Sequence, residues 1–116
     1  MSDWQATIQI DTASTVGVLA AQSGTIFIAN AADIEYGLPA TQKGLTFTFI
    51  AQVVETGTVG LSVSPVPLDN INGGTDDKDL INSFGGDVAG DSITVVGDGV
   101  NGWYTTSKIG TWAAEA

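Results

Sequence analysis

The chain has 116 residues, 43% of them hydrophobic, and a formal net charge of −10 from 13 acidic residues against three lysines. A domain of this length can bury a real core, and its negative charge disfavours binding to nucleic acid or to anionic membrane surfaces. Cysteine and histidine are absent, which excludes disulfides, thiolate nucleophiles and the commonest general base. The composition therefore predicts one soluble domain, residues 1–116, that is not an enzyme.

The chain opens with alternating apolar and polar residues. The apolar positions are Trp4, Ala6, Ile8 and Ile10. This period of two predicts that residues 1–10 form an N-terminal strand with its apolar side in the core, or a short arm. The segment lacks the basic start and apolar block of a signal peptide, and no apolar run reaches the ~18–20 residues of a membrane span. We therefore expect synthesis in a cytoplasm without a cleaved signal.

Most of the remaining chain keeps the same period. Short strands are expected at 16–20, 25–30, 45–54, 59–64, 91–96 and 102–112. Within the strongest segment, 45–54, the pattern predicts that Phe47 and Phe49 face the core. Between 68 and 90 glycine, asparagine and aspartate predict loops, with a short strand or a single helical turn at 79–84. No convincing exact repeat is visible, so a solenoid is disfavoured.

These segments together predict an all-β protein. A chain with several short strands and a turn about every ten residues is typical of a compact antiparallel β-sandwich or a barrel-like domain of the jelly-roll or tulip type. The glycines of Gly97-x-Gly99-x-x-Gly102 match the spacing of a dinucleotide-binding loop. A strand follows them and not a helix, so we interpret them as a hairpin turn.

The sequence contains few candidates for chemistry. Asp76, Asp77 and Asp79 form a glycine-flanked acidic loop that is a calcium candidate, but their spacing does not match an EF-hand loop. The favoured interpretation is a solvated acidic loop, with no metal and no cofactor. Glu35 and Glu55, with one of the aspartates, are the carboxylates that a glycosidase would use, a minimal pattern that most acidic proteins meet by accident.

Aromatic residues are the candidates for contact with a partner or with another subunit. They are Trp4, Trp103, Tyr104 and Trp112. Exposed aromatic rings often mark interfaces, because each brings a large rigid apolar face, although core packing explains such residues equally well. Trp4 and Trp112 lie near the ends of the chain, where a small monomer covers side chains poorly.

Three elements carry a resemblance to a known class of proteins. They are Leu38-Pro39-Ala40 before Gly44-Leu45, the loop Asn70-Ile71-Asn72-Gly73, and Gly90-Asp91-Ser92-Ile93-Thr94 leading to Gly102-Trp103-Tyr104. In this order the chain, from about 23 to 112, resembles small β-rich virion proteins of tailed bacteriophages, most of all capsid cement (decoration) proteins. The resemblance implies a homotrimer, without catalytic residues, on the outer surface of the phage head.

There it would bind the major capsid protein and clamp the shell. The chain differs in having no proline-rich N-terminus and no long arm, so any lacing segment would be short. The alternative function is a receptor- or carbohydrate-binding β-module of a phage tail fibre or adhesin.

Overall fold

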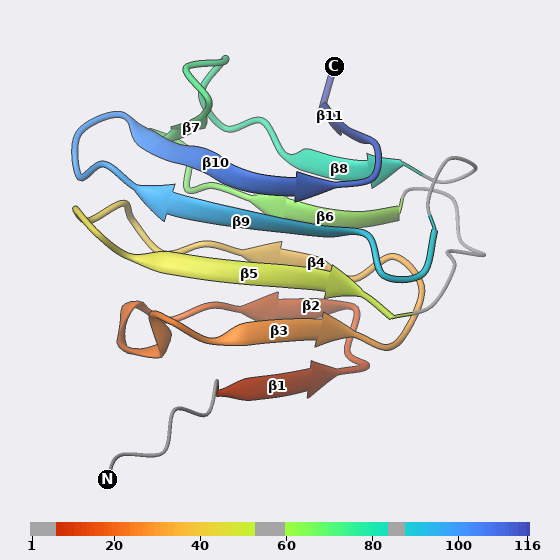
Figure 1. Ribbon diagram of the computed structural model, residues 1–116. Coiled ribbons are helices and arrows are strands. Elements are labelled where there is room, and N and C mark those ends of the chain that lie inside the picture. The colour runs from red at the N-terminus through yellow and green to blue at the C-terminus, as the bar shows by residue number, and fades with distance from the viewer. Residues whose placement is uncertain (1–6, 53–59, 84–87) are drawn as a thin grey trace, which may run out of the picture.

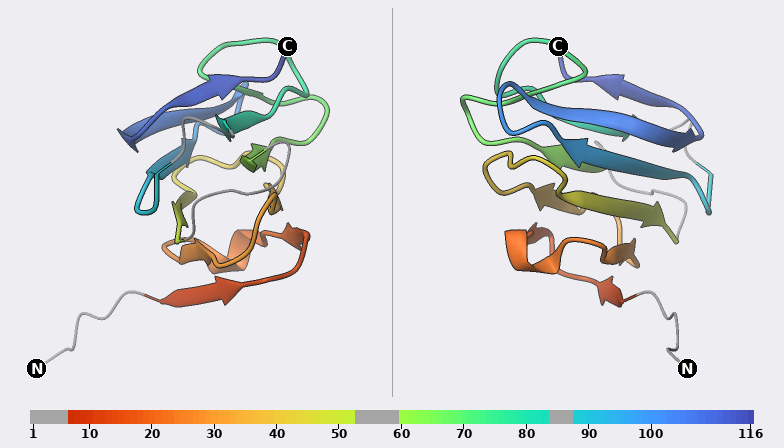
Figure 2. Two further views of the ribbon diagram at one scale, coloured as in Figure 1. Left: turned by 90° about the vertical axis from the view of Figure 1, so that its right-hand side faces the viewer. Right: turned by 60° about the vertical axis from the view of Figure 1, so that its left-hand side comes forward.

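The computed structural model describes residues 7–52, 60–83 and 88–116. They form two stacked β-sheets and one short 3-10 helix, η1 (Ala20–Gln22), with the core between the sheets (Figure 1; Figure 2). The predicted all-β sandwich is confirmed.

Each sheet contains strands from both halves of the chain. The six-stranded sheet, sheet A, has the order β1 (Ile8–Asp11), β3 (Ile26–Ala29), β5 (Thr46–Ala51), β9 (Ser92–Gly97), β10 (Gly102–Ile109) and β7 (Asn70–Ile71). The five-stranded sheet, sheet B, has the order β11 (Trp112–Ala114), β8 (Leu80–Ser83), β6 (Gly60–Ser64), β4 (Glu35–Gly37) and β2 (Thr15–Gly17).

The N-terminal half winds back and forth between the two sheets like a short parallel β-solenoid. From β1 to β6, successive strands lie in alternate sheets, and neighbours within each sheet run parallel (Figure 1). Paired positions are 18 residues apart from Ile8 to Ile26 but 22 apart from Ile26 to Thr48. Successive solenoid turns of unequal length leave no fixed repeat in a sequence. The expected antiparallel pairing is therefore wrong for this half, which adopts the solenoid-like path that the sequence disfavoured.

The C-terminal half pairs antiparallel, as predicted. Strand β9 lies between β5 and β10, and β8 lies between β6 and β11. The expected hairpin joins β9 to β10, and the segment at 79–84 contributes the strand β8. The pairing of β9 with β10 shifts register between Thr105 and Ser107.

The β9–β10 turn packs tightly against another part of the chain. A Cβ added at Gly97 would lie 2.5 Å from the carbonyl oxygen of Gln42, and one added at Gly102 would overlap the backbone of Asn70. The hydroxyl of Thr41 donates to the carbonyl oxygen of Gly102 at 2.6 Å. These glycines are thus required for close approach of two backbones as well as for the turn itself.

The turn is also held by a single carboxylate. Oδ1 of Asp98 accepts hydrogen bonds from the backbone amides of Val100, Asn101 and Gly102 at 2.8, 2.9 and 3.0 Å. These bonds, above all those from Gly102 and Val100, lower the pKa of Asp98 because they favour the charged form.

Aromatic side chains fill the core. Phe27, Tyr36 and Phe49 pack together with ring centroids 4.8 to 5.5 Å apart, and Trp103 packs against Phe47 at 5.7 Å. All five side chains are fully buried. The prediction that Phe47 and Phe49 face the core is confirmed.

Strand β1 is turned the opposite way from the expectation. Ile8 and Ile10 are 56% and 61% exposed, whereas Asp11 is buried. The hydroxyl of Tyr36, from sheet B, donates to Oδ2 of Asp11 at 2.8 Å, and Nε2 of Gln9 donates to Oδ1 at 2.8 Å. Because side chains alternate strictly along a strand, placing Asp11 inside puts both isoleucines outside. The prediction of a buried apolar side is therefore wrong for Ile8 and Ile10.

Candidate interaction surface

The outer side of sheet A is a broad apolar surface, which we call the isoleucine face. Along β3, β5 and β9 every second residue is buried, and the residues between them point outward. The face consists of Ile8, Ile10, Ile26, Ile28, Thr46, Thr48, Ile50, Ser92, Thr94, Val96, Tyr104, Ser107 and Ile109. Its most exposed hydrophobic members are Ile8, Ile10, Tyr104 and Ile109, at 42 to 61%.

Strand register arranges these side chains in continuous rows across the sheet. One row is Ile10, Ile28, Ile50, Ser92 and Ile109. In the neighbouring row the hydroxyls of Thr48 and Thr94 bond to each other at 2.9 Å. Because these hydroxyls satisfy each other, contact with an apolar surface leaves neither of them without a partner.

The isoleucine face carries no charge. In the described strands of sheet A the charged residues are Asp11 and Lys108; by register both stand on the inward side of the sheet, where Asp11 is buried and Lys108 is exposed. Asp11 bonds to Tyr36, and Lys108 lines a hollow at the edge of the sandwich. In a chain of net charge −10, this surface is where another protein can approach without meeting a charged side chain.

The predicted aromatic contact residues are distributed differently from the expectation. Tyr104 lies on the isoleucine face and is 42% exposed. Trp103 is fully buried, so its prediction as a contact residue is wrong; among the described residues its indole nitrogen has no hydrogen-bond partner. Trp112 is 7% exposed, and its indole nitrogen donates to the carbonyl oxygen of Ile109 at 3.0 Å. Trp4 lies outside the described residues.

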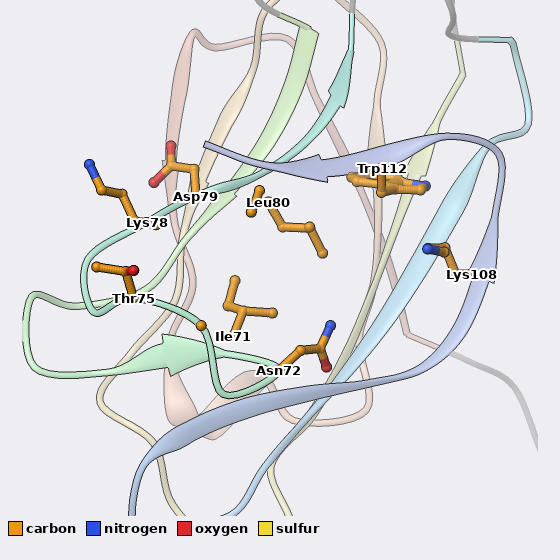
Figure 3. Close-up of a pocket in the computed structure, with 10 residues that line it drawn as sticks. Ile71, Asn72, Thr75, Lys78, Asp79, Leu80, Lys108 and Trp112 are labelled. Atoms are coloured by element: carbon orange, nitrogen blue, oxygen red, sulfur yellow. The ribbon is translucent and has the colours of Figure 1, made fainter. Parts of the chain in front are cut away.

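A second surface feature is a hollow of about 320 Å³ between the edge strands of the two sheets (Figure 3). Its lining is Ile71, Asn72, Gly74, Thr75, Lys78, Asp79, Leu80, Lys108, Trp112 and Ala114. Two of the three lysines of the chain, Lys78 and Lys108, are on it. The amide of Asn72 is already engaged, since its Oδ1 accepts from the backbone amide of Thr105 at 2.9 Å. The volume is at the lower end of the range for small-molecule pockets.

The three acidic calcium candidates bind to different neighbours. Asp76 accepts a hydrogen bond from the side chain of Asn70 at 3.1 Å, and the backbone amide of Asp79 donates to Glu115 at 3.1 Å. The backbone amide of Asp77, a residue with a positive φ of 62°, donates to the carbonyl oxygen of Asp69 at 3.0 Å. Across residues 7–52, 60–83 and 88–116, no group of three or more acidic side chains is placed to hold a metal ion.

Asp79 is in an unfavourable electrostatic environment. Burial raises its pKa, and the negative charges of Glu115, Glu35 and Asp77 raise it further. A hydrogen bond with Ser64 is the second-largest effect and lowers the pKa, but the net shift is upward. The charged form of this carboxylate is therefore less stable in the folded protein than in water.

The sequence offered no signal for the polar residues that the fold buries. Asn82 is fully buried, and its side-chain nitrogen donates to Oδ2 of Asp91 and to the carbonyl oxygen of Thr111, both at 3.0 Å. Gly110 packs directly on the carboxylate of Asp91. These contacts anchor the β10–β11 connection.

Of the glycosidase carboxylates, Glu35 is exposed on β4, and Glu55 lies outside the described residues.

Within the part of the chain that the structure describes, no helix is long and apolar enough to cross a membrane. No protein-family model matches this chain, and no curated protein matches it.

Proposed function

We propose that this chain is a structural virion protein without enzymatic activity: a capsid cement protein of a tailed bacteriophage. In this proposal it acts as a homotrimer, binds the major capsid protein on the outer surface of the head and stabilises the shell. The protein is made in the host cytoplasm and joins the assembled particle, and it needs neither nucleic acid nor a membrane.

The observation that carries the proposal is the isoleucine face. It is an uncharged surface on the outer side of a sheet, and six isoleucines contribute to it. Large exposed apolar patches on soluble proteins mark sites of protein contact. The resemblance of the 38–45 and 90–104 segments to cement proteins points to the same class.

Cementing requires only binding energy. A protein that binds the assembled shell and not its open or ruptured state stabilises the shell by mass action. The acidic surface fits a position outside the capsid, away from packaged DNA, because negative charges repel phosphates.

The direct test is to mix the purified protein with phage heads that lack it. We expect saturable uptake at symmetric positions, measured as copies per particle, together with greater resistance of the heads to heat or to a chelator. The absence of uptake, combined with binding to host cells or to glycans, would contradict the proposal.

The alternative, a receptor- or carbohydrate-binding module, is supported by the hollow. Its lining combines Leu80 and Trp112 with lysine, threonine and carboxylate groups, the mixture of apolar and polar groups that small-molecule sites use. The near-complete burial of Trp112 leaves little of its ring for stacking. This function predicts that Lys108→Ala weakens glycan binding, whereas Lys43→Ala, outside the hollow, leaves it unchanged.

A further inference from the structure

We infer that the isoleucine face is where one copy of this chain packs against another. The inference deepens the homo-oligomer in the proposed function, and on its own it does not require a capsid. Its partner is a second copy of the same chain.

The orientation of β1 is the first argument. Its hydrophobic side chains, Ile8 and Ile10, point away from the core, and its polar side chains, Gln9 and Asp11, point inward. An alternating strand of this kind normally buries its apolar side. Here the folded chain buries the other side, so the apolar side of β1 is left for a contact between molecules.

Charge is the second argument, and it selects the partner. Two copies that each carry a net charge of −10 repel each other through most of their surfaces. Across the isoleucine face that repulsion is weakest, because the outward residues of the described strands are uncharged, and Lys108, although exposed, stands by register on the other side of the sheet. A foreign partner could instead recognise the acidic surface through basic groups. A surface without charge therefore fits self-association best.

The area of the isoleucine face indicates how strongly two copies should associate. Five strands with a spacing of about 4.8 Å, over about 20 Å of strand length, give a plan area of roughly 480 Å². The accessible area is larger because exposed isoleucines stand above this plane. An interface of about 600 Å² per partner lies at the small end of specific contacts. We therefore expect association in the micromolar range and not an obligate oligomer.

The test compares two charge-matched double variants of the isolated protein by sedimentation velocity from about 1 µM to 1 mM. Ile10→Glu/Ile109→Glu places charges on the face, at side chains that are 61% and 59% exposed. Leu19→Glu/Leu68→Glu is the control, because these leucines are 63% and 85% exposed outside sheet A. Circular dichroism and thermal melting of dilute samples verify that both variants fold.

We expect the wild type and the leucine control to associate above micromolar concentration. The isoleucine variant should associate at least about 100-fold more weakly, since burying unpaired like charges is costly. A wild-type mass that stays at 11.8 kDa up to 1 mM overturns the inference, as does association that the isoleucine variant retains in full.

The failure of this inference and the failure of the proposed function can be told apart. Uptake of a monomeric wild type by phage heads would reject the contact between copies and keep the cement function. If the isoleucine variant then lost uptake, the face would belong to the capsid contact instead.

Discussion

The hydrogen bond from Tyr36 to Asp11 provides a sharp test of how the sandwich is closed beside β1. Tyr36→Phe keeps the buried ring and its packing against Phe27 and Phe49 at 5.5 and 4.8 Å, and removes only the hydroxyl. The carboxylate of Asp11 then loses a 2.8 Å bond inside the protein. Burial, followed by the hydrogen bond and charge of Asp11, holds the pKa of Tyr36 far above its ordinary value. The hydroxyl is therefore a donor throughout the neutral pH range.

A hydrogen bond to a charged group contributes about 1.5–3 kcal/mol, so we expect Tyr36→Phe to lower the free energy of unfolding by about that amount. The assay is urea unfolding at pH 7, at equal and low protein concentration. Tyr104→Phe is the matched control, because Tyr104 is the other tyrosine of the chain and is exposed. A loss for Tyr36→Phe no larger than that of the control would refute the argument. In a double-mutant cycle with Asp11→Asn, we expect a coupling energy of at least about 1 kcal/mol.

Three further predictions concern Gly102, Asp79 and Asp98. Gly102→Ala places a Cβ against the backbone of Asn70 and should cost at least about 2 kcal/mol in urea unfolding. Gly17→Ala, where a Cβ meets nothing within 4 Å, should cost much less, and equal costs would contradict the close approach. Asp79 and Asp98 have pKa values shifted in opposite directions, so the effects of their charges on the stability of the fold should have opposite signs. The raised pKa of Asp79 makes its charge destabilising above the unfolded pKa. Asp79→Asn should thus raise the melting temperature at pH 7, and this gain should disappear in acid. The lowered pKa of Asp98 contributes stability above the unfolded pKa that is lost as the pH falls through the folded value. Asp98→Asn should therefore lower the melting temperature at pH 7 and match the wild type in acid. For either variant, a change in melting temperature at pH 7 of the opposite sign would refute the direction of the pKa shift given for that aspartate.

Local pattern was sufficient to predict much of the fold. The alternation over 45–54 placed Phe47 and Phe49 in the core, and the glycines between two strand-like segments predicted the β9–β10 hairpin. Both features depend on residues close together in the chain. Strand periodicity and turn chemistry are properties of short segments, so a sequence displays them directly.

The surface that carries the functional proposals was not predictable in the same way. Trp103 was a contact candidate and lies in the core, whereas the outward isoleucines of β3 and β5 were not singled out. An apolar residue on a strand produces the same apolar–polar alternation in the sequence whether it faces the core or a partner. Tyr104, also a contact candidate, is exposed because it is adjacent to the buried Trp103, and adjacent residues face opposite sides of a strand.

The all-β class, the absence of histidine and cysteine and the large excess of acidic residues can all be read from the amino-acid sequence. The parallel pairing of the first half, the position of Gly102 against Asn70, and the orientation of β1 with Asp11 inward and its isoleucines outward became visible in the folded chain. Alternation defines two sides of a strand without indicating which of them faces the core. That choice depends on Tyr36, which lies 25 residues beyond Asp11 and donates the hydrogen bond that keeps a carboxylate in the interior.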